Sequence, residues 1–95
     1  MDSEFEQLRK RSQQNLVVFL TIELDLGLEF AQTAKMQAQM QNHENFERSR
    51  EYAEAALEVV HKFSARIVNS DMRQQLQERA DELQKAVSSL WPRPN

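Results

Sequence analysis

The chain has no cysteine, one glycine and two prolines among its 95 residues. The lack of cysteine excludes disulfides and thiolate metal sites. Both prolines lie within the last four residues, so the rest of the chain has almost none of the turn-forming residues that a sheet of hairpins requires. Glutamine, glutamate, alanine, leucine and arginine, which favour helices, are abundant instead. The composition therefore predicts one small all-α domain.

Charge and hydropathy narrow the classes of partner. The formal net charge is −3, so nucleic acid is not generally attracted. The one dense basic run, residues 9–11, is offset by Glu4 and Glu6. The most apolar run, residues 16–28, is shorter than a membrane span and contains two acidic residues. The N-terminus also lacks the features of a signal peptide. We therefore expect a cytoplasmic protein that binds neither nucleic acid nor membranes.

Apolar residues recur at helical spacing in three blocks, residues 3–41, 44–68 and 71–90. The two connections contain helix-capping residues, Asn42 or Asn45 in the first and Ser70 or Asp71 in the second. Short connections make successive helices antiparallel neighbours. The pattern thus predicts an all-α, antiparallel three-helix bundle with a long first helix. Residues 16–90 form the bundle, residues 1–15 form a helical extension that either frays or contacts another subunit, and residues 91–95 form a flexible tail.

Small residues are expected to join the first two helices, because they let helices approach closely. Ala53 and Ala56 recur on one face of the second helix. Facing residues should lie equally far from residue 42, which puts Gly27 level with Leu57. We interpret Gly27 as a point of close approach, with a kink as the alternative. The expected core face of the first helix comprises Phe5, Leu16, Phe19, Leu20, Leu26, Phe30, Ala31, Ala34 and Ala38.

The first helix carries more apolar residues than its core face uses. One flank has Val18, Ile22, Met36 and Met40, and the other has Val17, Leu24 and Leu28. The third helix can cover only one flank, and an uncovered apolar patch usually marks an interface. We therefore predict a non-catalytic interaction or assembly module that binds a protein or peptide helix and forms a homodimer through the first helix. The predicted contact residues are Val17, Val18, Ile22, Leu28, Met36 and Met40.

Neither an enzyme signature nor a cofactor motif stands out, and metal binding is the alternative from another class. Glu58 and His61 have the Glu-x-x-His spacing by which helical bundles hold iron. Glu23 is expected level with His61, so a dimer of hairpins could assemble a ferritin-like site from these three residues. Glu58, however, points away from the core of its helix. The simpler expectation is that Glu23 is partly buried and bonded to His61 or to a nearby arginine.

An aromatic residue follows the first turn, and alanines recur at three- and four-residue spacings on both sides of it. In this pattern the chain resembles tetratricopeptide-type and MIT-type helical modules over about residues 28–90. The resemblance implies a non-catalytic module that receives a partner's helix in a groove beside the third helix. The turn here has no glycine, and the first helix is longer than in those modules. The matching residues are Ala31, Ala34, Ala38, Asn45, Phe46, Ser49, Tyr52, Ala53, Ala56, Leu57, Val60, Ala80 and Leu83.

Overall fold

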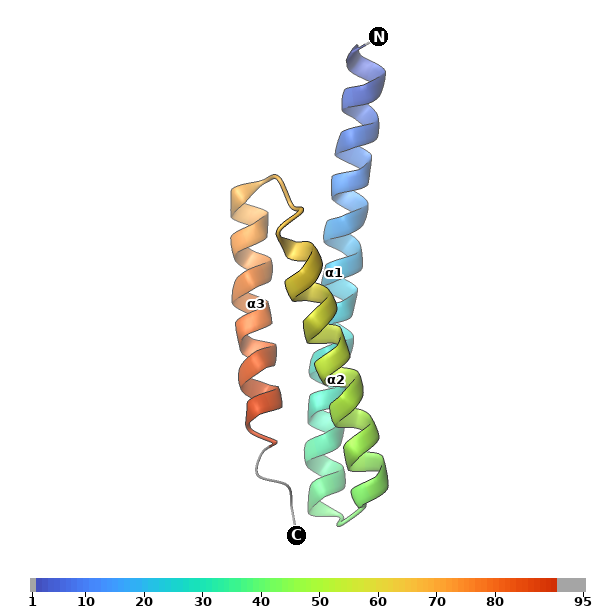
Figure 1. Cartoon of the computed structure of the whole chain (residues 1–95), viewed down its shortest axis with the longest axis vertical. Helices are drawn as coiled ribbons and strands as arrows, with labels where there is room; N and C mark the ends of the chain where they lie inside the picture. The colour runs from blue at the N-terminus through green and yellow to red at the C-terminus, as the bar shows by residue number, and fades with distance from the viewer. Residues whose placement is uncertain (1, 91–95) are drawn as a thin grey trace.

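The computed structural model describes residues 2–90, with side chains from residue 3 onward, and this part of the chain folds into three helices. They are α1 (Asp2–Gln39), α2 (His43–Ser64) and α3 (Ser70–Ser88). The chain reverses direction at each connection, and α1 extends well beyond the connection between α2 and α3 (Figure 1). The predicted all-α, three-helix fold with a long first helix is confirmed. The predicted tail, residues 91–95, lies outside the described residues.

The first connection is a tight helix-ending turn. The Asn42 N–H donates to the Gln37 carbonyl at 2.9 Å, and the Gln41 N–H donates to the Ala38 carbonyl at 3.1 Å. Gln41 has a φ of 59°, the left-handed conformation that usually favours glycine at this position. The Asn42 side chain then caps α2 by accepting from the Asn45 N–H at 3.3 Å. Asn42 is thus the cap, as one of the two sequence alternatives predicted.

The second connection begins earlier than predicted, because α2 ends four residues before the expected boundary. Ile67 leaves the helix and folds into the core, where it is 1% exposed. Asn69 caps α3, its Oδ1 accepting from the Met72 N–H at 3.0 Å. The prediction of Ser70 or Asp71 as the cap was therefore wrong. Asn69 has the extended backbone that an N-cap needs, and the next residue is already helical.

Gln13 of α1 holds this second connection in place. Its Nε2 donates to the Arg66 carbonyl at 3.0 Å, and its Oε1 accepts from the Val68 N–H at 2.8 Å. From α3, the Arg73 guanidinium donates to the Ile67 carbonyl at 2.9 Å. Three consecutive residues of the connection are therefore hydrogen-bonded to side chains of α1 and α3. This clamp places the end of the bundle at the level of Gln13.

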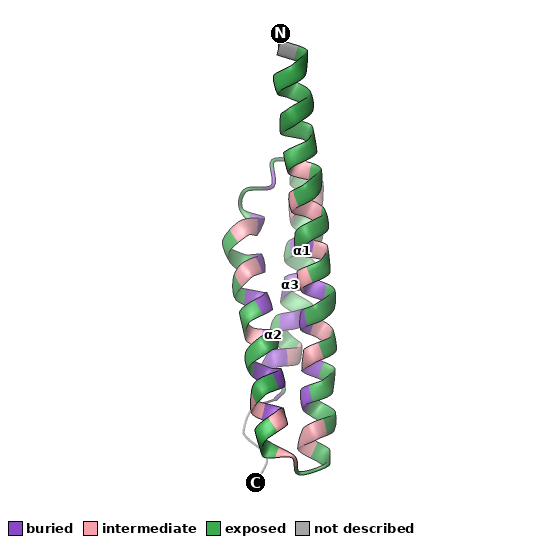
Figure 2. Cartoon of the chain, turned by 90° about the vertical axis from the view of Figure 1, so that its right-hand side faces the viewer, coloured by how far each residue is buried: buried purple, intermediate pink, exposed green. Residues whose placement is uncertain are grey.

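The core face of α1 is rotated relative to the sequence prediction. Phe5, Phe19 and Leu26 were expected in the core but are 66%, 45% and 41% exposed. The rotation arises because α2 and α3 both pack on α1, so its buried face lies between them (Figure 2). The buried positions of α1 are Leu20, Leu24, Gly27, Ala31 and Ala34.

Gly27 lies where α1 closely approaches both α2 and α3. A Cβ atom at this position would lie 2.7 Å from Leu83 Cδ2 and 3.1 Å from Ala56 Cβ. Both distances are shorter than ordinary carbon contacts, so even a Cβ atom here would require Leu83 and Ala56 to shift. The interpretation of Gly27 as a point of close approach is confirmed, and α1 is one continuous helix through it.

Side-chain contacts along the hairpin follow the expected register. The Ser49 hydroxyl donates to Gln37 Oε1 at 2.9 Å. Nearer the middle of the molecule, the rings of Phe30 and Tyr52 lie 5.0 Å apart. In both pairs the two residues lie nearly equally far from residue 42, within about one helical turn. α1 and α2 are therefore held together by polar, aromatic and small-residue contacts in one register.

Candidate interaction surface

The first predicted flank of α1 is open to solvent. Val18, Ile22, Met36 and Met40 are 57%, 50%, 61% and 72% exposed. Keeping apolar side chains in water costs roughly 25 cal/mol for each Å² of exposed apolar surface. A partner that covers this flank would therefore stabilise the chain.

The second predicted flank is covered within the chain. Val17 and Leu28 are partly buried against the hydrophobic core, and Leu24 is fully buried in it. That core includes Leu76, Ala80 and Leu83 of α3. The position of α3 therefore decides which flank is open, a point that the sequence pattern had left undecided.

Three residues of the open flank, Ile22, Met36 and Met40, belong to a longer stripe with a seven-residue period, which we call the α1 seam. Counting in sevens from residue 5 and from residue 8 gives eleven positions along α1 and its end, and every one is exposed. Such positions correspond to a and d of a coiled-coil heptad. The α1 seam comprises Phe5, Leu8, Ser12, Asn15, Phe19, Ile22, Leu26, Glu29, Thr33, Met36 and Met40.

Most of the exposed apolar surface lies on this seam. Among residues 3–90, seven of the ten large apolar side chains that are exposed belong to it. Val18 flanks the seam directly, which leaves Tyr52 and Val68 outside α1. The exposed apolar residues are thus gathered into one line opposite the core, a distribution that isolated surface residues rarely show.

About half of this surface was not predicted from the sequence pattern. Phe5, Phe19 and Leu26 were expected in the core, and Leu8 was given no role. The signal was present as the seven-residue spacing of Phe5, Phe19, Leu26 and Met40. It was overlooked because one helix face was assumed to hold most of the large apolar residues.

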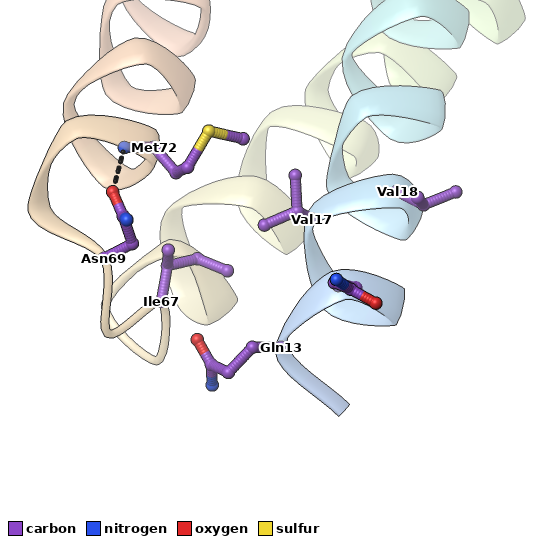
Figure 3. Close-up of a pocket in the computed structure, with 7 residues that line it drawn as sticks. Gln13, Val17, Val18, Ile67, Asn69 and Met72 are labelled. Carbon is purple, nitrogen blue, oxygen red and sulfur yellow. Dashed lines mark hydrogen bonds between the residues drawn. The ribbon is translucent and has the colours of Figure 1, made fainter. Parts of the chain in front are cut away.

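A groove opens beside the seam, between α1 and the start of α3. Its volume is about 530 Å³, and Val17, Ile67 and Met72 point toward one another across it, whereas Val18 points away (Figure 3). The groove is mainly apolar, and the Gln13 clamp lies at its edge. The resemblance to tetratricopeptide-type and MIT-type modules implied a partner helix beside the third helix, and this groove adjoins the first turn of α3.

An ion pair joins α1 to α3 beside the seam. Arg79 of α3 donates a hydrogen bond to Asp25, which flanks the seam on α1.

Arg50 is the one charged residue among residues 3–90 that is buried, and it donates to Glu47 and Glu54 at 2.7 Å each. The hydrogen bond to Glu47 is the largest effect that raises the pKa of the Arg50 guanidinium above its usual value. These three residues belong to α2, so their cluster supports that helix.

The residues of the metal alternative do not come together. Glu58 and His61 are exposed on α2, and Glu23 is half-buried on α1. The expected bond between Glu23 and His61 is not formed, nor does Glu23 bond to an arginine among the described residues. Within residues 2–90, no three side chains of His, Cys, Asp or Glu lie so that they could hold a metal ion. The described chain therefore gives this alternative no support.

In residues 2–90, every helix is too short or too polar to cross a membrane. Comparison with family models, curated proteins and solved structures gives no match to this chain. The candidate surfaces therefore have to be assessed on their own geometry.

Proposed function

We propose that this chain is a non-catalytic assembly module that pairs with a second copy of itself through the α1 seam. The observation that carries the proposal is the unbroken exposure of all eleven seam positions along a helix whose opposite face is the core. Apolar residues at a and d positions pack as knobs into the holes of a facing helix. A second copy would remove the exposed apolar residues of the seam from water.

The extent of the seam suits a dimer interface. From Phe5 to Met40 it runs over about 53 Å, at 1.5 Å for each residue. A typical specific interface uses about 20–30 residues from each partner. The eleven seam positions, which correspond to a and d, and the neighbouring e and g positions of the same heptads together amount to about 22 residues. Seven of the eleven seam positions are apolar, and Ser12, Asn15, Glu29 and Thr33 are polar.

A second occupant, a partner's peptide helix, is favoured by a different observation. The groove in Figure 3 is apolar and adjoins α3, where such a helix could insert. Binding there depends on Met72, whereas self-association depends on Ile22. The variants Met72→Glu and Ile22→Glu therefore separate the two functions.

Sedimentation equilibrium tests the proposed self-association. We expect the wild-type chain to form a concentration-dependent dimer and Ile22→Glu to be monomeric, because the new carboxylate would be buried against apolar side chains. The control is Gln77→Glu, which adds the same charge at an exposed position of α3 and should dimerise like the wild type. A wild-type chain that stays monomeric at millimolar concentration would contradict the proposal.

A further inference from the structure

The seam contains one charged residue, Glu29, and what lies opposite it decides how two copies can pair. In a parallel pair in register, each seam residue faces its own copy. Glu29 would then face the partner's Glu29 between a leucine layer and a threonine layer, and like charges at such a position repel. A parallel pair would also align the two helix dipoles unfavourably. The seam therefore disfavours a parallel arrangement.

We propose that two copies pair antiparallel about a two-fold axis between residues 20 and 21, with Ser12 opposite the partner's Glu29. This inference rests on the proposed function, because it specifies the geometry of that same seam. In this register the Ser12 hydroxyl can donate to the carboxylate, so both polar groups are matched. The symmetry of the pair creates the contact twice.

Two apolar layers fit the same register, whereas Leu8 lies opposite the partner's Thr33 and Asn15 lies opposite the partner's Leu26. Phe19 lies opposite the partner's Ile22 at the centre, and Phe5 lies opposite the partner's Met36 near each end. A shift of one heptad in either direction would bring Glu29 opposite Phe19 or opposite Phe5. A carboxylate buried against a ring without a hydrogen bond costs several kcal/mol. Two antiparallel registers keep Glu29 beside a polar residue, but the one that places it opposite the partner's Thr33 leaves Phe5, Leu8 and Phe19 uncovered. The register centred between residues 20 and 21 covers all three.

The shape of the molecule favours the same pairing. Residues 3–12 of α1 are exposed on every side and extend beyond the bundle (Figure 2). A helical segment of about ten residues with no packed face is marginal in water. In the antiparallel register this segment lies along residues 29–38 of the partner, which belong to a helix already held by its own α2. Each copy thus covers the projecting turns of the other.

The variant Ser12→Lys tests the register, because the two orientations predict opposite results. In the antiparallel register the new ammonium group faces the partner's Glu29, and two ion pairs should lower the dimer Kd about fivefold at low salt. Added salt should remove this gain. In a parallel pair, two ammonium groups would face each other and the Kd would rise. The control is Ser12→Lys combined with Glu29→Gln, in which the gain should disappear.

Cysteine crosslinking gives an independent readout, since the natural chain has no cysteine. Phe5→Cys and Met36→Cys, mixed above the dimer Kd and oxidised, should form the mixed disulfide and little of either homodimer. Homodimeric crosslinks in place of the mixed one would overturn the antiparallel arrangement while leaving self-association intact. An unchanged or raised Kd for Ser12→Lys would overturn the register. If the wild-type chain never dimerises, the proposed function fails as well.

Discussion

The two faces of α1 are both apolar but are built from different residues. The inner face has Gly27, Ala31 and Ala34 between buried leucines, and three helices approach closely there. The outer face is the α1 seam, where seven of the eleven positions are large apolar residues such as Phe19 and Ile22, and all of them are exposed. Small side chains let backbones approach within one chain, whereas large ones need the wider spacing of a coiled coil. Side-chain size, more than hydrophobicity, therefore separates the core from the proposed interface.

The largest effect should come from shortening a leucine on one face and not on the other. Leu24 is fully buried and Leu26, two residues away, is 41% exposed. We expect Leu24→Ala to lower the free energy of unfolding by about 3 kcal/mol, because it leaves a cavity in the core. Leu26→Ala should change it by less than about 0.5 kcal/mol and should weaken dimerisation instead. Urea unfolding at low protein concentration measures both, and equal losses would erase the distinction between the two faces.

Enlarging a small residue tests the close approach of the helices. Gly27→Leu should destabilise the fold by about 2–3 kcal/mol, because the new side chain collides with Leu83 and Ala56. This loss should exceed the roughly 1 kcal/mol that leucine gains over glycine in helix propensity. The matched change on the outer face is Thr33→Leu, which should leave the fold intact and tighten the dimer. Thermal unfolding measures the stability of both variants. A Gly27→Leu variant as stable as the wild type would contradict the packing described.

A smaller effect is expected at Gln13, which holds the second connection in place. Gln13→Ala removes the hydrogen bonds to the Arg66 carbonyl and the Val68 N–H, and should cost about 1 kcal/mol because both groups can turn to water. Hydrogen exchange at the Val68 amide should speed up accordingly. Gln14→Ala changes an exposed neighbour and serves as the control. If both variants exchange alike, Gln13 does not anchor the second connection.

Much of the fold could be predicted from the sequence, because it depends on local chemistry. The scarcity of glycine and proline predicted an all-α fold, and the helical periodicity of three blocks predicted three helices. Asn42 was one of the two caps expected for the second helix, and the small-residue face that contains Gly27 predicted the close approach. The end of α2 was not predictable in this way, because the four residues after it, 65–68, are also compatible with a helix. Tertiary packing draws Ile67 into the core and ends the helix earlier.

The candidate surface was predictable only in part. Val18, Ile22, Met36 and Met40 were identified as a flank, but choosing between the flanks required the position of α3. Phe19 and Leu26 were placed on the wrong face because the expected core face was centred too far toward them. The packing of α3 rotates the buried face toward Leu24 instead.

Hydrogen exchange of α1 at two protein concentrations tests the proposed pairing most directly. Amides of residues 5–12 belong to turns that are exposed on all sides in a single chain, so they should exchange rapidly when the protein is dilute. Above the dimer Kd, the partner should cover these turns and slow their exchange at least tenfold, while amides of the core change little. Exchange at residues 5–12 that is equally fast at both concentrations, in a sample shown to be dimeric, would contradict the account.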